Sequence, residues 1–260
     1  MALFQSSNPT LKESVYEGTI FQDTLIDRSN SMSVRGTLNK FGILLLLMMS
    51  TAIWSWQYAV KGNSMMPFIL VGVFGGLILS FIMYRNPKTS SYLAPIYALL
   101  EGLFIGGISA YFEYGRAMSG GYQGIVIQAV GLTFAVALAM YALYHFKVIT
   151  VTQKLRSVIT IATVAVGIFY LATFVLGLIM GPSATPAFMY NSSLLSIGIS
   201  LFVVGLAAMN LLLDFDNVEK GVALGAPKYM EWYSSFGLLV TMVWLYLEIL
   251  RLLAKISGRD

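Results

Sequence analysis

Four acidic side chains fall inside or at the edge of long apolar segments of this 260-residue chain. Glu101 lies in the middle of the apolar run 91–112, and Asp214, Asp216 and Glu248 lie within or beside two later runs. An ionisable group at bilayer mid-depth costs roughly 2.5 kcal/mol or more, so it normally faces a protein interior or a watery cavity. The pattern therefore predicts a membrane protein that passes or senses ions or protons.

Seven apolar segments are each long enough to position these acids in a bilayer. The chain is 57% hydrophobic and 11% charged, with a mean hydropathy of +0.76, which is too apolar for an ordinary soluble domain. A spanning helix needs about 20 apolar residues. The segments that qualify are 41–60, 66–84, 91–112, 122–146, 157–181, 193–214 and 233–254. These unbroken runs do not fit a β-barrel, so we expect an all-α membrane domain over 41–256 and a polar tail over 1–40.

Lysine and arginine residues near the segment ends indicate the orientation. With the amino terminus inside, eleven of these cations lie on the inner side and five on the outer side. The amino terminus lacks the short apolar core and cleavage site of a signal peptide. We therefore expect a cytoplasmic tail and an extracytoplasmic carboxyl terminus. The sequence pI near 9.2 comes from the same loop cations and gives no reason to propose nucleic-acid binding.

The residues that intramembrane enzymes need are scarce. The chain has no cysteine, which excludes disulfides and thiolate metal sites, and its one histidine, His145, cannot form a histidine pair. Ser109 and Ser200 have no obvious basic partner in the sequence, and Asp214 lies near the inner end of its segment. We therefore expect neither an enzyme nor a bound organic cofactor.

Helical geometry separates the acids of the last two segments. Asn210 and Asp214 are four residues apart and share a face, whereas Asp216 points roughly 200° away from Asp214. Glu248 precedes Arg251 by three residues, a spacing that permits an ion pair near the outer surface. Glu101 has no charged residue within one turn, so we expect its partner to come from another helix or from water. The alternative for Glu101 is a protonated side chain that hydrogen-bonds to a neighbouring helix.

Several segments of the chain resemble one family of membrane proteins. They are the turn MYRNPK, the helix ALLEGLFIG, and the stretches LLLDFDNVEKG and KYMEWYSSFGLLVTMVWLYLEILRLL. Together they resemble the Bax inhibitor-1 family, in particular its bacterial YccA/YetJ-like branch, over about residues 40–256. The resemblance implies six helices around a central seventh and a pH-sensitive calcium leak in the bacterial inner membrane. It also implies a latch of two aspartates on the last two helices, assisted by an arginine.

The family pattern assigns the latch to particular residues. Its sixth-helix aspartate begins a D-x-x-x-I/V pattern that matches Asp214 with Val218, and its arginine matches Arg85. Its seventh-helix aspartate lies in a LYLD sequence, where this chain has Glu248. The chain thus departs from the pattern in the type of acid, and the stretch between the two acids is also longer than expected.

The longer stretch leaves the partner of Asp214 open. In an antiparallel hairpin that turns at 221–227, the residue level with Asp214 is near Ser234. Glu231 is then closer in depth to Asp214 than Glu248 is. Either Glu231 or Glu248 can therefore be the second acid of the latch.

Two carboxyl groups at one site of low dielectric constant share a proton and titrate as a coupled pair. Such an oxygen-rich site, formed by Asp214 and Glu248, would attract a hard cation such as calcium. Glu101, Asn210 and Asp216 would then line the ion path. The alternative function is a non-conducting regulator that binds a membrane protease or quality-control complex through the tail.

The charge distribution generates a direct prediction about topology. A reporter that is active only in the cytoplasm should be active when fused to the amino terminus and inactive when fused to the carboxyl terminus, because cations favour the cytoplasmic side. Activity of a periplasmic reporter should show the reverse pattern. Both termini on one side of the membrane would contradict a seven-span topology.

Overall fold

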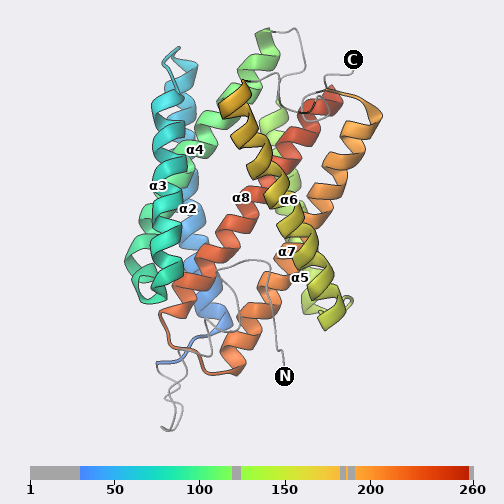
Figure 1. Cartoon of the computed structure of the whole chain (residues 1–260). Helices are drawn as coiled ribbons and strands as arrows, with labels where there is room; N and C mark the ends of the chain where they lie inside the picture. The colour runs from blue at the N-terminus through green and yellow to red at the C-terminus, as the bar shows by residue number, and fades with distance from the viewer. Residues whose placement is uncertain (1–29, 119–123, 182–185, 187–190, 258–260) are drawn as a thin grey trace.

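The computed structural model describes residues 30–118, 124–181, 186 and 191–257, which form seven long helices (Figure 1). A short 3-10 turn, η2 (Pro87–Thr89), separates the second and third of them. The helices are α2 (Val34–Val60), α3 (Met66–Arg85), α4 (Ser90–Met118), α5 (Ile125–His145), α6 (Gln153–Met180), α7 (Leu194–Ala223) and α8 (Met230–Ser257). All seven are long and apolar enough to cross a membrane, which confirms the predicted fold class.

Helix α8 lies between two groups of helices (Figure 1). On one side α2 and α3 both pack against α4, and on the other side α5 and α6 both pack against α7. The contacts of α8 are mainly with α2, α4, α5 and α7. It is also the most buried helix, with 67% of its apolar window buried, compared with 11% for α6. A complete ring of six helices around the seventh stays a prediction.

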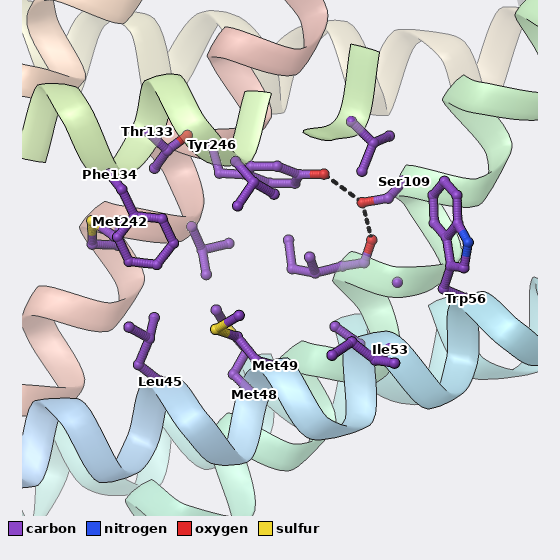
Figure 2. A pocket seen from close by; sticks show the side chains of 16 residues that line it. Leu45, Met48, Met49, Ile53, Trp56, Ser109, Thr133, Phe134, Met242 and Tyr246 are labelled. Atoms are coloured by element: carbon purple, nitrogen blue, oxygen red, sulfur yellow. Dashed lines mark hydrogen bonds between the residues drawn. The ribbon is translucent and has the colours of Figure 1, made fainter. Parts of the chain in front are cut away.

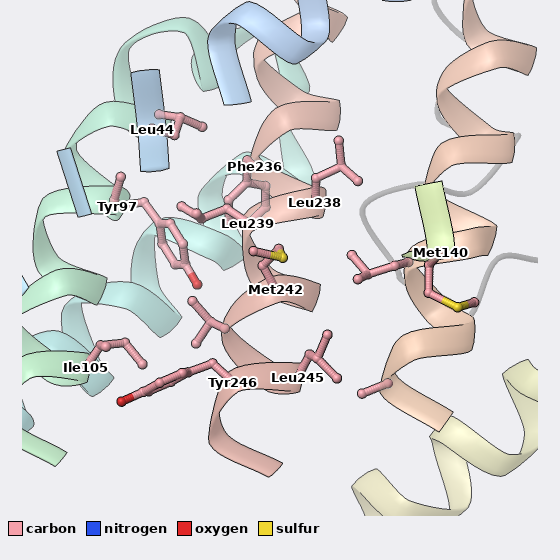
Figure 3. Close-up of a cluster of buried hydrophobic side chains, with 14 of the residues drawn as sticks. Leu44, Tyr97, Ile105, Met140, Phe236, Leu238, Leu239, Met242, Leu245 and Tyr246 are labelled. Carbon is pink, nitrogen blue, oxygen red and sulfur yellow. The ribbon is translucent and has the colours of Figure 1, made fainter. Parts of the chain in front are cut away.

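The buried apolar core is built around α8 (Figure 3). Phe236 of α8 meets Tyr97 of α4 edge to face, with ring centroids 4.8 Å apart, and Leu239 and Leu245 are fully buried beside them. Lipid tails are as apolar as these side chains, so van der Waals packing rather than water exclusion holds such helices together. The shape of the α8 surface therefore determines which helices can pack against it.

Small residues allow α4 to approach both of its neighbours closely. Gly102 and Gly106 have the small-xxx-small spacing of close helix pairs, and they face α2, where a Cβ atom on either would overlap backbone carbonyl oxygens. Gly72 and Gly76 of α3 have the same spacing and face α4 in turn. The three helices therefore form one tightly packed layer.

Capping explains why α2 begins at Val34 rather than at residue 41. Ser33 is extended, and its hydroxyl accepts a hydrogen bond from the Gly36 backbone N–H at 3.0 Å, which satisfies one free donor of the first turn. The polar residues that follow are therefore helical. The expected boundary between tail and membrane domain, at residues 40 and 41, falls inside α2.

Helix α7 also extends further than the apolar run 193–214 indicated. It continues nine residues past Asp214 to Ala223, and its additional turns bury Asn217, Val218 and Gly221 against neighbouring helices. A sequence of polar residues is helical here because its charges have partners inside the protein. Asp214 consequently lies roughly 13 Å from the end of its helix, deeper than the sequence suggested.

Substituting Gly106 should test the close approach of α2 and α4. A Cβ at this position would overlap Ser55 Oγ and the Ala52 carbonyl oxygen, so Gly106→Ala should lower the free energy of unfolding by about 1–3 kcal/mol, as overpacking does. Thermal unfolding of the purified protein in detergent measures the effect.

The matched control is Gly131→Ala in α5, where a Cβ meets nothing within 4 Å. Because alanine favours helix by up to about 1 kcal/mol, this variant should be unchanged or slightly more stable. Equal unfolding midpoints for the two variants would contradict the close packing at Gly106.

Candidate functional site

Asp214 of α7 is fully buried and faces α8. Its Oδ2 accepts a hydrogen bond from the Thr241 hydroxyl at 2.5 Å. The residue level with Asp214 is therefore Thr241 and not Ser234, because the longer α7 moves the turn of the hairpin towards Pro227. This corrects the expected depths: by the helical rise, Glu248 is roughly 10 Å and Glu231 roughly 15 Å from Thr241 along the axis.

Glu231 lies at the start of α8, where its carboxylate binds residues at the beginning of α2. One carboxylate oxygen accepts hydrogen bonds from the Ser33 backbone N–H and hydroxyl, both at 3.0 Å, and the other forms an ion pair with Lys40. Two backbone hydrogen bonds lie alongside, from Met32 N–H to Ala226 and from Lys228 N–H to Asn30. The segment 30–40 therefore closes this end of the bundle against the α7–α8 connection.

Asp216 points away from Asp214, as the separation of about 200° indicated, and the helix that it meets is α6. It forms ion pairs with Arg156 of α6 and with Lys220, one turn later on α7. Arg156 is 3% exposed and also donates to Asn217 Oδ1 at 2.7 Å. Arg156 directly precedes the apolar run 157–181, and this position indicated an exposed loop cation instead.

Glu248 forms a cluster near the other end of α8. It pairs with Arg251 at 2.8 Å, as their spacing indicated, and accepts hydrogen bonds from Tyr170 of α6 at 3.1 Å and from Trp244 at 3.2 Å. One turn beyond Arg251, Lys255 adds a second cation.

Arg85, to which the family resemblance assigned the role of the latch arginine, is exposed at the end of α3. Its guanidinium group lies over the Phe81 ring of its own helix, 5.9 Å from the centroid. Among the described residues, Arg156 is the arginine in an ion pair with an acid of α7, namely Asp216. A latch role for Arg85 stays a prediction that no described contact supports.

The two remaining polar candidates lie on different helices. Glu101, 8% exposed, interacts with the Tyr97 hydroxyl one turn earlier on α4 and lies against Gly76 of α3. The expectation of a partner from another helix overlooked this tyrosine. Asn210 donates to Thr163 of α6 and to the Leu206 carbonyl, both at 2.8 Å.

The three acids considered for the latch thus have separate partners: Asp214 a hydroxyl, and Glu231 and Glu248 a cation each. Along the axis of α8, Asp214 is roughly 10 Å from Glu248 and roughly 15 Å from Glu231. Within the described ranges, no three histidine or acidic side chains come together as a metal site. A calcium ion would therefore meet these carboxylates one after another rather than in a single cage.

A cavity of about 220 Å³ between α2, α4, α5 and α8 has a different character (Figure 2). Its lining is mainly apolar, with hydroxyl groups from Ser109, Thr133 and Tyr246. The Ser109 and Tyr246 hydroxyls are 2.6 Å apart. A hard cation prefers charged oxygen ligands, so this cavity does not suit a cation path.

Ser200 contradicts the expectation that it lacks a basic neighbour. Lys255 donates a hydrogen bond to its hydroxyl at 2.8 Å, across the α7–α8 interface. The two residues are 55 positions apart, and no spacing or motif connects them. The absence of enzymatic activity stays a prediction.

A protein-family model described as Bax inhibitor 1 like matches residues 5–258. The chain belongs to the Bax inhibitor 1 like family. Comparisons with curated proteins and with solved structures give no match. Membership of the family agrees with the resemblance found in the sequence, and the narrower placement in the YccA/YetJ-like branch stays a prediction.

Several partners in this family member were not identified from sequence, and Lys40, Arg156 and Thr241 are three that contact acids of the last two helices. The two cations lie at segment ends, where an exposed loop position is the usual expectation. Thr241 is an ordinary residue of an apolar run. Of these three, only Arg156 could have been anticipated. The polar residues after Asp214 can continue the helix inside the bundle only if a cation compensates Asp216.

Removing Arg156 should destabilise the bundle. Arg156→Gln leaves Asp216 with Lys220 alone, and loss of one partner of a buried pair costs about 3 kcal/mol at the lower end of the usual range. Thermal unfolding in detergent measures the loss, with the exposed neighbour Lys154→Gln as the control. Adding Asp216→Asn to Arg156→Gln should restore part of the stability, and a further loss would contradict the pairing.

Proposed function

We propose that this Bax inhibitor 1 like protein allows cations, above all calcium, to leak across the bacterial inner membrane under the control of protons. The observation that carries the proposal is Asp214, a fully buried carboxyl group roughly midway along the α7–α8 interface, which accepts a hydrogen bond from the Thr241 hydroxyl. Buried acids at membrane depth are costly, and they usually mark ion or proton paths.

Carboxylates at three depths along α8 support a cation path. Glu231 lies at one end, Asp214 contacts the middle, and Glu248 lies towards the other end. A cation that moved along α8 would meet each in turn, and carboxylate oxygens are the ligands that calcium prefers. Repeated weak sites of this kind favour conduction over permanent binding.

The ion pairs at both ends correspond to a closed state of such a path. Lys40 forms an ion pair with Glu231, and Arg251 forms an ion pair with Glu248. An entering cation would replace Lys40 at Glu231, so opening exchanges one cation for another and leaves no bare carboxylate in the membrane. The segment 30–40, which carries Lys40, would have to move away from α8.

Proton control is assigned to Asp214 in this proposal. The described ion pairs of α7 and α8 join Asp216 to Arg156 and Lys220, Glu231 to Lys40, and Glu248 to Arg251. Ionisation of Asp214 would add a negative charge between them at mid-depth. That charge attracts a cation, so raising the pH should increase the leak.

The test is calcium flux into liposomes that contain the purified protein, measured with an enclosed calcium-sensitive dye at several pH values. The parent should show flux that rises with pH. Asp214→Asn should give one flux at every pH, because asparagine keeps the size and hydrogen-bonding capacity of aspartate but has no proton to lose.

Glu101→Gln is the control variant, since Glu101 lies on α4, away from the α7–α8 interface. It should leave the pH response of the flux unchanged, because it does not alter Asp214. If Asp214→Asn still responds to pH like the parent, the sensor lies elsewhere. If the parent carries no calcium at any pH, the leak is excluded, and a non-conducting regulator of a membrane protease complex becomes the better description.

A further inference from the structure

A cavity of about 260 Å³ lies between α6 and α7, beside the last turns of α8. This volume is far larger than the roughly 10–15 Å³ that a single water needs. Two cations, Arg251 and Lys255, line it together with the hydroxyl-bearing side chains of Tyr170 and Ser200. The remaining lining residues are apolar: Ala165, Val166, Phe169, Ile199, Phe202 and Val203.

Both of the charged side chains that are described as lining this cavity are cations. Glu248, behind the lining, is the acid that pairs with Arg251. Lys255 is 6% exposed, and its amine donates to the Ser200 hydroxyl at 2.8 Å and to the Ser196 carbonyl at 3.4 Å. Two cationic side chains that line one cavity can both interact with an added anion, and charge-assisted hydrogen bonds of this kind are strong. The cavity therefore favours a negatively charged ligand.

The two kinds of lining lie at different depths. Lys255 is level with Ser200, near the end of the bundle where α8 finishes and α7 begins. The apolar wall continues from there towards the middle, because Ala165 precedes Tyr170 on α6 and Val203 follows Ser200 on α7. Phe202 lines the cavity and is 62% exposed, so the cavity opens on the surface that faces lipid. A ligand that fits must combine an anionic group with an apolar chain.

We propose that this cavity binds an anionic phospholipid from the leaflet at the carboxyl-terminal end of α8. The phosphate lies beside Lys255 and Arg251, and the first part of one acyl chain lies on the apolar wall. Free phosphate makes no use of that wall, and a zwitterionic headgroup carries a cation of its own that Lys255 repels. The site is separate from the proposed ion path, which it touches only through the Arg251–Glu248 pair.

Lipid binding to the purified full chain in detergent, counted by native mass spectrometry, tests the proposal. Dioleoylphosphatidylglycerol should bind more tightly than dioleoylphosphatidylcholine. Lys255→Gln should weaken phosphatidylglycerol binding about fivefold, the effect of one interfacial cation. Ala165→Phe, which fills the apolar part and removes no charge, should weaken it as well.

The matched control is Lys61→Gln, an exposed cation at the same end of the bundle but at the end of α2. It should bind phosphatidylglycerol like the parent. Equal binding by Lys255→Gln and the parent, or equal binding of the two lipids, would overturn the proposal. Displacement of the lipid by inorganic phosphate would overturn it in favour of a free-anion site. If Lys255→Gln does not fold, undiminished binding by Ala165→Phe overturns it.

Discussion

The arrangement of this bundle depends on the need to compensate every charge that lies inside it. In a bilayer an uncompensated ion costs several kcal/mol, and lipid offers no hydrogen bonds. Glu231 is compensated from α2 by Lys40, Asp216 from α6 by Arg156, and Glu248 within α8 by Arg251 and from α6 by Tyr170. The contacts that join two helices fix the depth of one helix relative to the other, whereas apolar side chains alone would let the helices slide.

The two halves of the bundle meet this requirement differently. The layer of α2, α4 and α3 is held by close backbone approach at glycines, and its one deep acid, Glu101, needs only a tyrosine one turn away. The side formed by α6, α7 and α8 contains the ion pairs and buried amide groups instead. Glycine packing is rigid because backbone atoms touch, whereas ion pairs can exchange partners. Motion is therefore easier on the polar side and at the segment 30–40.

Composition alone predicted the seven helices, because a run of about 20 apolar residues has few alternatives in a membrane. Helix ends were less predictable: α7 continues through DFDNVEKG because Arg156 and Lys220 neutralise Asp216, and that compensation exists only in the folded bundle. The same extension moved the level of Asp214 from Ser234 to Thr241. Local pairs such as Glu248 with Arg251 could be inferred from spacing, whereas Glu231 with Lys40 joins residues 191 positions apart and could not.

The separation of the acids bears on how protons and cations would be coupled in the proposed leak. Asp214 is roughly 10–15 Å along the axis from Glu231 and from Glu248, which is too far for two carboxyl groups to share one proton. Ionisation of Asp214 could still favour the exchange of Lys40 or Arg251 for calcium, because the exchange adds one positive charge beside Glu231 or Glu248 and the Asp214 carboxylate attracts it. At an effective dielectric constant near 20, two unit charges 10 Å apart interact by about 1.7 kcal/mol. That energy changes an equilibrium between closed and open pairs more than tenfold, so long-range electrostatics along α8 can replace a direct carboxyl pair.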